Sequence, residues 1–317
     1  MSRGRRVRRA LRRVRRALRR VWRALQYEWP LFQREWQLFR YPFLPPSLKS
    51  GVLRTGILLT ARRLRNTLRN TGDGIAQTRI LGFDVTAPSF GLLSFLFDEI
   101  FVNLDYFFVS RRTDPFILDC GSNIGISILF FKALYPEAEI VAFEPEESTC
   151  ALLEKNITSN GLSSVQVHQV ALGMEESTVD FFVDPESPSS LLMSSKRNTL
   201  PKRIMVPQVK LSTFIDREVD FLKLDVEGAE DSVLQDLVAS GTISKIDQMV
   251  VEYHHHIDKS KDAFSAFLGQ LENNGFGYQI SSLYPIGARV SRTQAFQDIR
   301  VYAYRKNPVA KRTPLQS

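Results

Sequence analysis

The segment Phe116–Ser127, with the sequence FILDCGSNIGIS, restricts the fold of this chain more than any other. An apolar strand pattern ends at Asp119, the chain passes through Gly121 and Gly125, and an amphipathic helix pattern follows. Glycine lets a backbone approach a ligand closely, and the first turn of a helix presents free N–H groups with a partial positive charge. The pattern therefore predicts a strand–loop–helix unit that binds a nucleotide-like ligand. A glycine turn that serves packing alone is the alternative.

Strand and helix patterns alternate through the region around this loop and beyond it. The predicted strands are Phe116–Cys120, Ile140–Phe143, Val165–Val170, Val179–Val183, Phe221–Leu224, Gln248–Glu252 and Arg300–Tyr304, and the predicted helices are Ile126–Leu134, Ser148–Asn160, Glu230–Ser240 and Lys261–Asn273. Such alternation predicts a mostly parallel α/β sheet of the Rossmann-like kind. The segments after Asn274 have no helix pattern between them, so an antiparallel edge is expected there.

A carboxylate follows the next strand pattern at a spacing typical of adenosine-binding folds. Glu144 lies nineteen residues after Gly125, where it can accept hydrogen bonds from both ribose hydroxyls. A dinucleotide-binding loop has glycine at its middle position, where the backbone meets the pyrophosphate. This chain has Asn123 there. A cofactor with no pyrophosphate and with an amino-acid end fits better, so the sequence predicts S-adenosylmethionine rather than NAD.

A second strand pattern ends in acidic residues. Phe221–Leu224 is followed by Asp225, Glu227 and Gly228, and then by a helix pattern. In open α/β sheets ligands bind beyond the carboxyl ends of the strands, so these acids are expected to face the same crevice as the glycine loop. The alternative is a helix-capping cluster, in which each acid stabilises the first turn by ~0.3–1 kcal/mol. The two interpretations are compatible.

Three consecutive histidines, His254–His256, follow the strand pattern that ends at Glu252. Successive side chains of an extended chain point to opposite sides, so the three could hardly bind one metal ion. No metal is therefore predicted. His254 is predicted to serve as a base or hydrogen-bond donor in the pocket.

Taken together, these motifs resemble the FkbM-type methyltransferases. The resemblance rests on ILDCGSNIGIS, VAFEPE, VALG at Val170–Gly173, FLKLDVEGAE, VVEYH and the upstream FDEIFVNLDYFF, and it covers about Ile75 to Lys306. It implies a seven-stranded class I methyltransferase fold that transfers a methyl group from S-adenosylmethionine to a hydroxyl of a sugar, polyketide or other small metabolite. Cys120 and Ser122 depart from the small apolar residues that are more usual in the family. Agreement is poorer over Ser187–Pro207, so acceptor specificity does not carry over.

The resemblance also implies roles for individual residues. The cofactor would contact the acidic, glycine and asparagine positions of the two loops, namely Asp119, Gly121, Asn123, Gly125, Glu144 and Asp225. The methyl-transfer site would be bordered by Asp225 and Glu227, with Glu252 and His254 on the acceptor side. An alcohol needs a general base within ~2.6–3.2 Å, and His254, Asp225 and Glu227 are the candidates, with His254 favoured.

Nucleic-acid methylation fits the motifs less well. The strand end that would carry an Asn/Asp-Pro-Pro-Tyr stretch in an enzyme acting on base amines has D-V-E-G instead, and no Pro-Cys nucleophile is present. The expected function is thus methylation of a small-molecule or glycan acceptor. The alternative is a nucleic-acid- or membrane-surface-binding protein whose methyltransferase-like domain is catalytically inert.

Positive charge is concentrated at one end of the chain. The net charge is +8, but residues 1–25 hold twelve arginines and no acid, in a heptad-like repeat that spaces Val7, Leu11, Val14 and Leu18 along one helical face. Such a helix firms up against an anionic surface, because its own like charges repel. A peripheral membrane anchor is favoured. A mitochondrial or plastid transit peptide comes second and nucleic-acid binding third, and a solvated tail is the remaining alternative.

Four regions are expected: an Arg-rich amphipathic helix at 1–25, a helical and linker region at 26–74, the methyltransferase domain at 75–310 and a tail at 311–317. The most apolar segment, Leu92–Phe108, is interrupted by acidic residues and is not expected to span a bilayer. Two cysteines outside any C-x-x-C pair favour a reducing compartment. The expected location is cytoplasmic, at a membrane surface where the Arg-rich segment binds one.

Overall fold

The computed structural model of the chain describes Leu38 and residues 41–42, 44–69, 74–184, 193–195, 200–257, 262–282 and 297–306. The chain divides into two compact units, Met1–Asp105 and Tyr106–Ser317. The Arg-rich segment at 1–25 and the tail at 311–317 lie outside the described residues. The domain boundaries expected at residues 75 and 310 remain predictions.

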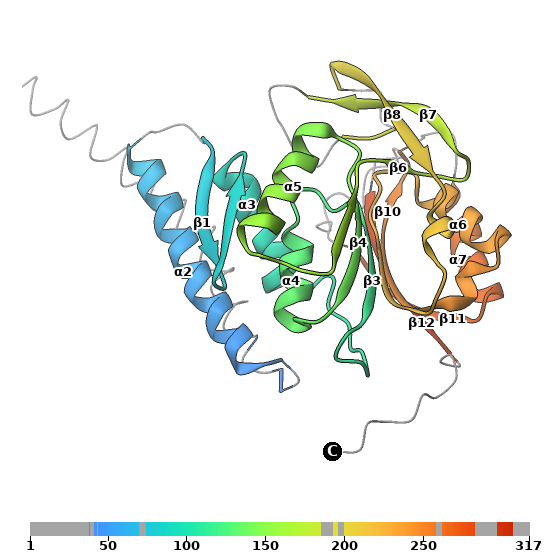
Figure 1. Ribbon diagram of the computed structural model, residues 1–317, viewed down its shortest axis with the longest axis horizontal. Helices are drawn as coiled ribbons and strands as arrows, with labels where there is room; N and C mark the ends of the chain where they lie inside the picture. The colour runs from blue at the N-terminus through green and yellow to red at the C-terminus, as the bar shows by residue number, and fades with distance from the viewer. Residues whose placement is uncertain are drawn as a thin grey trace, which may run out of the picture. The chain divides into compact units, whose positions relative to one another are not determined.

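The first unit contains a long helix, a hairpin and a short apolar helix (Figure 1). Helix α2 spans Pro46–Arg69, strands β1 and β2 span Ala76–Ile80 and Phe83–Ala87, helix α3 spans Phe90–Phe97 and a π-helical turn, η2, spans Asp98–Val102. The hairpin strands pair antiparallel around Leu81 and Gly82, both of which have positive φ. Ser89 begins α3, since its side chain accepts a hydrogen bond from the Leu92 N–H at 3.0 Å. No helix in the described part of the chain is long and apolar enough to cross a membrane.

The second unit is built on a seven-stranded sheet with the order β11-β12-β10-β9-β3-β4-β5. The strands are β3 (Phe116–Cys120), β4 (Glu139–Phe143), β5 (Val165–His168), β9 (Val219–Leu224), β10 (Ile246–His255), β11 (Phe276–Ser282) and β12 (Gln297–Arg305). The pairs among β5, β4, β3, β9 and β10 are parallel, and β12 is antiparallel to both of its neighbours. This is the mostly parallel, Rossmann-like sheet with an antiparallel edge that the sequence predicts.

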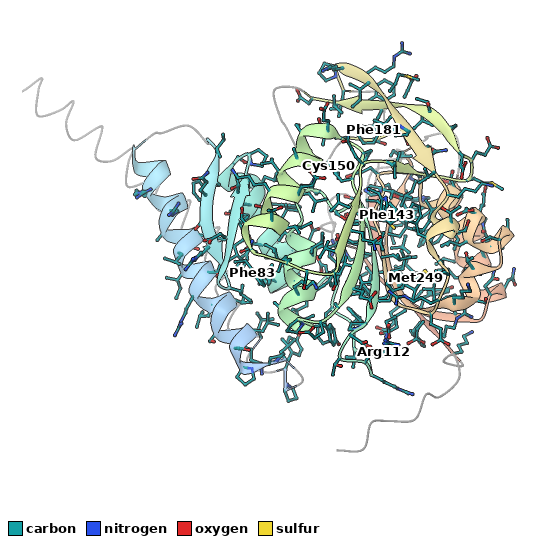
Figure 2. The ribbon with its side chains drawn as sticks, in the orientation of Figure 1. Phe83, Arg112, Phe143, Cys150, Phe181 and Met249 are labelled. Carbon is teal, nitrogen blue, oxygen red and sulfur yellow. The ribbon has the colours of Figure 1, made fainter. Side chains whose placement is uncertain are left out.

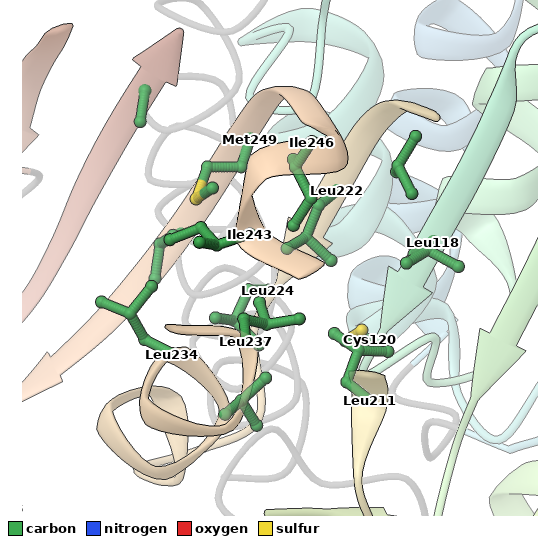
Figure 3. Close-up of a cluster of buried hydrophobic side chains, with 14 of the residues drawn as sticks. Leu118, Cys120, Leu211, Leu222, Leu224, Leu234, Leu237, Ile243, Ile246 and Met249 are labelled. Atoms are coloured by element: carbon green, nitrogen blue, oxygen red, sulfur yellow. The ribbon is translucent and has the colours of Figure 1, made fainter. Parts of the chain in front are cut away.

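Helices cover both faces of this sheet. Helices α4 (Ile126–Leu134) and α5 (Glu147–Ser159) lie on one face, and α6 (Glu230–Ala239) and α7 (Phe264–Asn273) lie on the other (Figure 1). Phe143 and Met249 are buried within the body of the unit, whereas Arg112 extends at its edge (Figure 2). Leu234 and Leu237 of α6 pack with Leu224 in the main apolar cluster (Figure 3). A sheet covered on both faces explains the continuous apolar runs of its strands.

A small second sheet branches from the main one after β5. Strands β6 (Ala171–Leu172), β7 (Ser177–Val183) and β8 (Lys202–Val209) form it in the order β6-β8-β7. The strand predicted at Val179–Val183 is thus present, but it pairs antiparallel with β8 outside the main sheet. Two 3-10 turns, η3 (Leu211–Phe214) and η4 (Thr242–Lys245), lead into β9 and β10.

The register of the parallel strands brings three loops together. Cys120 at the end of β3 lies opposite both Phe143 at the end of β4 and Leu224 at the end of β9. The loops that follow these strands therefore lie side by side at the carboxyl edge of the sheet. They carry the predicted site residues.

Candidate active site

The loop after β3 is shaped by residues with left-handed backbone. Gly121 has φ +85, and a Cβ at this position would lie 1.8 Å from the carbonyl oxygen of Asp225, so no side chain fits there. Gly125 begins α4 with φ +86, and a Cβ there would lie 2.6 Å from Leu153 Cδ1. Asn123 between them has φ 47, which asparagine adopts more readily than most residues, and its side chain accepts a hydrogen bond from the Ile124 N–H at 2.9 Å. Close packing against backbone therefore requires glycine at position 121, and the left-handed backbone favours it at position 125.

Asp119 lies beneath this loop and is fully buried. Its Oδ2 accepts a hydrogen bond from Ser127 Oγ at 2.5 Å, and its Oδ1 lies 3.6 Å from Lys223 Nζ. Burial raises the pKa of Asp119, although the Lys223 ammonium and the serine hydroxyls oppose that rise. Asp119 thus holds β3, α4 and β9 together at the base of the loop.

Glu144 follows β4 and faces the same loop. Its Oε2 accepts a hydrogen bond from the Asn123 N–H at 3.1 Å, and its Oε1 accepts one from the Glu146 N–H at 3.0 Å. Its residue is only 6% exposed, and burial raises the pKa of Glu144 to about 7 against the pull of those two N–H donors. Each carboxylate oxygen has a second lone pair, so the group can still accept hydrogen bonds from a ligand. The predicted spacing of nineteen residues therefore does bring Glu144 to the glycine loop.

Lys223, which the motif analysis did not select, ties the two acidic loops together. Its Nζ donates to the Gly121 carbonyl oxygen at 2.6 Å and lies 3.2 Å from Asp225 Oδ2 as well as 3.6 Å from Asp119. It also lies 5.0 Å from the centre of the Tyr106 ring. The two carboxylates keep the pKa of Lys223 above its ordinary value despite burial. The sequence feature that could have indicated this role is the position of Lys223 between two leucines in an apolar strand pattern.

Asp225 and Glu227 come from the loop between β9 and α6. The Asp225 N–H donates to the Cys120 carbonyl oxygen at 3.1 Å, which places this loop directly beside the first one. Burial acts to raise the pKa of Asp225, but Lys223 and His254 outweigh it and hold the pKa below its ordinary value. Glu227 has φ 52 and Gly228 has φ 101, so the chain turns sharply here and directs the Glu227 carboxylate toward β10. Both acids therefore reach the edge of the sheet predicted for them.

His254 is the point at which the acids converge. Its Nδ1 lies 2.9 Å from Glu230 Oε1, and its Nε2 lies 3.2 Å from Glu227 Oε2 and 4.0 Å from Asp225 Oδ1. Burial acts to lower the pKa of His254, but the Glu230 and Glu227 carboxylates dominate and raise it well above its ordinary value. The ring is thus hydrogen-bonded through Nδ1 to Glu230, while its Nε2 faces the Glu227 carboxylate. The predicted role of His254 as a general base remains a prediction.

Glu230 at the start of α6 holds this arrangement in place. Its Oε1 accepts hydrogen bonds from the Gly228 N–H at 2.9 Å and the Val226 N–H at 3.2 Å, in addition to the contact with His254. Glu230 lies in the first turn of α6, as the capping interpretation expects of an acid, whereas Asp225 and Glu227 precede the helix and face the imidazole. Glu230 is a second residue that sequence analysis did not assign to the site.

Strands β10 and β12 contribute further charged side chains near His254. Arg300 Nη2 donates to Glu252 Oε2 at 3.4 Å, and both side chains are largely buried. Burial and the neighbouring Asp225 raise the pKa of Glu252 to about 7, with Arg300 opposing. Asp298 of β12 lies 3.9 Å from His254 Nε2. Glu252 therefore lies near His254, as expected, and β12 adds a further carboxylate.

The remaining two histidines turn away from this cluster. His256 has φ 61 in the turn after β10, so its ring stacks on that of His255 with centroids 3.6 Å apart. Its Nε2 lies 2.6 Å from Asp262 Oδ1. Ligand atoms of His255, His256 and Asp262 lie within 4.8 Å of one another, as do those of Asp225, Glu227 and His254. The absence of a metal remains a prediction.

Negative charge exceeds positive charge in this region. Six carboxyl groups are close to three cationic side chains. The acids are Asp119, Asp225, Glu227, Glu230, Glu252 and Asp298, and the cations are Lys223, His254 and Arg300. Such a surplus attracts a positively charged ligand group or a polar donor. The glycine loop and Glu144 lie next to it on the same sheet edge.

Comparison with known proteins identifies the family of the chain. Residues 119–278 match the sequence model of the methyltransferase FkbM domain, and they include the glycine loop, Glu144, the acidic loop and the histidines. The chain belongs to the FkbM methyltransferase family. It is therefore a methyltransferase, and the resemblance found from its motifs is confirmed.

Individual relatives and solved structures are similar to this chain. The chain is 31% identical over 210 residues to Methyltransferase 1 of Beauveria bassiana, which covers 59% of this chain and 82% of that protein. It is 26% identical over 168 residues to the 2-O-methyltransferase NoeI of Sinorhizobium fredii, covering 45% of this chain and 65% of that one. Among solved structures, the methyltransferase FkbM of Methylobacillus flagellatus is 15% identical with a TM-score of 0.43, and the match covers 88% of this chain and 60% of that one.

Proposed function

We propose that this protein is an S-adenosylmethionine-dependent O-methyltransferase that acts on a hydroxyl group of a sugar, polyketide or other small metabolite. The observation that carries the proposal is the joining of Glu144 to the glycine loop, where its carboxylate accepts the Asn123 N–H at 3.1 Å. An acidic group at the second strand end, beside a glycine loop at the first, is the arrangement that binds an adenosine ribose in this class of sheet.

The residues of the loops suit this cofactor. Glu144 would accept the ribose hydroxyls, and the loop from Asp119 through Gly121 and Asn123 to Gly125 would hold the methionine end. Asn123 occupies the position at which a dinucleotide loop has glycine, which disfavours a pyrophosphate. The surplus of carboxylates around His254 favours a cationic sulfonium at this edge of the sheet.

The chemistry assigned to the chain is positioning and proton removal. When bound, S-adenosylmethionine would supply an electrophilic methyl group carried on a sulfonium. Alignment of the acceptor oxygen supplies much of the rate of methyl transfer. The hydroxyl proton needs an acceptor on the protein.

The carboxylate of Glu227 is proposed to be that proton acceptor, with Asp225 beside it. His254 lies 3.2 Å from Glu227 and 2.9 Å from Glu230, so it is proposed to orient the Glu227 carboxylate through an ion pair. The preference for His254 as the base in the sequence argument is thereby replaced by a positioning role. An acceptor oxygen fits the name of NoeI, which is described as a 2-O-methyltransferase.

Cofactor binding tests the proposal directly. The full chain is expected to bind S-adenosylmethionine and not NAD in isothermal titration calorimetry. Replacing Glu144 by Ala should weaken the binding by ~1–3 kcal/mol through the loss of charged hydrogen bonds. Replacing the exposed neighbour Glu147 by Ala removes the same charge and should leave the affinity unchanged.

Transfer of a labelled methyl group to a panel of glycans and hydroxylated metabolites then tests the acceptor class. A folded chain that does not bind S-adenosylmethionine would support the inert-domain alternative. Binding that is unaffected by Glu144→Ala would show that the ribose lies elsewhere. Labelled product formed only on amines would overturn the assignment to hydroxyl acceptors.

A further inference from the structure

Helix α2 of the first unit carries an apolar pair on an exposed face. Ile57 is 52% exposed and Leu58 is 54% exposed, near the middle of a 24-residue helix. Large aliphatic side chains exposed next to each other are unfavourable in water unless another surface covers them. Nothing in the methyltransferase site uses either residue.

The opposite face of α2 is already occupied by packing within its own unit. Leu48, Val52 and Leu59 are each at most 3% exposed. Thr55 on this side accepts a hydrogen bond from the Leu81 N–H at 3.2 Å, and Arg62 donates to the Gln77 carbonyl oxygen at 3.3 Å. The helix is thus anchored without Ile57 and Leu58.

Exposed residues form a stripe along one side of α2 beyond its first turn. Among the residues from Ser50 onward whose burial is described, the exposed positions are 50, 54, 57, 58, 61 and 65, which recur at helical spacing. Arg54 and Arg65 lie on this stripe on either side of the apolar pair, and both are exposed. The stripe, defined here as Ser50, Arg54, Ile57, Leu58, Ala61 and Arg65, therefore combines an apolar centre with cationic ends.

The charge of the surrounding sequence has one sign. Helix α2 contains six Lys and Arg and no Asp or Glu. Residues 1–74 contain 20 Lys and Arg against 3 Asp and Glu, whereas residues 75–317 contain 22 against 31. The cations are therefore segregated into the part of the sequence that contains the exposed stripe.

We propose that the exposed stripe of α2 binds the surface of an anionic lipid bilayer. A helix that lies in the interface buries its apolar side chains below the headgroups and keeps its cations at the level of the phosphates. Each Arg or Lys near such a surface adds about 1 kcal/mol of attraction, or roughly a fivefold gain in affinity. A nucleic acid would also attract the arginines, but it gains little from Ile57 and Leu58, because aliphatic side chains offer no stacking surface to bases.

Vesicle flotation of the full chain tests this proposal. With vesicles of phosphatidylglycerol and phosphatidylcholine in equal parts, the wild-type chain should float with the lipid, and vesicles of phosphatidylcholine alone should bind it weakly. The double variant Ile57→Glu and Leu58→Glu should lose roughly tenfold or more in affinity, because it places two carboxylates where the apolar pair meets the lipid.

The control variant is Met205→Glu with Ile280→Glu. These two residues of the second unit are 62% and 48% exposed, so the control changes the same number of exposed apolar side chains and the same net charge. It should bind vesicles like the wild type.

Equal binding by the two double variants would overturn the proposal, as would equal binding of the wild type to neutral and anionic vesicles. If the Ile57→Glu and Leu58→Glu double variant lost binding to single-stranded RNA but kept its binding to vesicles, the stripe would be assigned to nucleic acid instead. Because S-adenosylmethionine binding is measured separately, failure here leaves the proposed enzymatic function intact.

Discussion

Gly121 shows how one backbone position fixes the geometry of the site. Its amide and that of Ser122 both donate to the Phe143 carbonyl oxygen at 3.0 Å, and its own carbonyl accepts from Lys223 at 2.6 Å. These contacts link β3, β4 and β9 at one residue. The approach of the Asp225 carbonyl leaves no room for a side chain.

Substitution of Gly121 by Ala is accordingly expected to destabilise the fold by ~3–5 kcal/mol, because both the steric overlap and the left-handed backbone oppose it. Gly161 is the matched control, since it also has positive φ, at +57, but has no atom within 4 Å of the added Cβ. Gly161→Ala should cost only about 1 kcal/mol of backbone strain. Urea denaturation of the two variants measures the difference, and similar losses in both would contradict the account of close packing.

At the level of elements, the sequence predicts strands best where burial is complete on both faces. The predicted bounds Phe116–Cys120 of β3 match the structure, and its five residues are all buried. Strand β10 instead runs to His255, past the predicted end at Glu252, because it continues to pair with β12 as far as Gln297. That pairing joins residues more than forty positions apart, and no local pattern encodes it.

The site residues that could not be predicted from the sequence also depend on contacts that no local pattern encodes. The motifs indicate that Asp225, Glu227 and His254 share one sheet edge. They do not indicate that Glu230 would turn back to His254 Nδ1, or that Asp298 would arrive from β12 at 3.9 Å. Strand β8 was not predicted. It contains Pro207, and a proline within an apolar run argues against a central strand, although β8 is the middle strand of its small sheet.

The contact between α6 and β10 leads to a prediction for the titration of His254. Because the Glu230 carboxylate raises the pKa of His254, Glu230→Gln should lower that pKa. The chain has four histidines, so their ring signals can be followed individually by NMR as a function of pH. Asp231→Asn is the control, since Asp231 lies in the same helical turn but bonds Tyr253. In the proposed mechanism, activity declines when His254 loses its proton. Lowering the pKa of His254 should therefore lower the pH at which activity declines. An unchanged titration curve would remove Glu230 from its positioning role.

At the scale of the whole molecule, the site contains carboxyl groups that are buried on folding, and burial disfavours their charged forms. Glu144 and Glu252 both have pKa values raised to about 7, with burial as the main cause, from an ordinary value of 4.5. The folded protein therefore binds protons at these groups over a range of pH in which the unfolded chain has released them. A protein that uses Glu144 as an ionised ligand group must accept this loss of stability at neutral pH.

The stability of the chain should consequently fall as pH rises from about 5 to about 8. A group whose folded pKa is raised contributes stability that is fully present below its unfolded pKa, here 4.5, and that is lost as pH rises through its folded pKa, here about 7. Each of the two glutamates should account for ~1–3 kcal/mol of this decline, and the raised pKa of His254 acts in the same direction. Glu144→Gln replaces the titrating group by a neutral one of the same shape, so its unfolding free energy should decline less steeply over this range than that of the wild type. Glu147→Gln changes an exposed residue three positions further along the chain and should leave the wild-type slope unchanged. Urea denaturation at several pH values measures both slopes, and equal slopes for Glu144→Gln and the wild type would show that Glu144 is ionised in the folded protein well below pH 7.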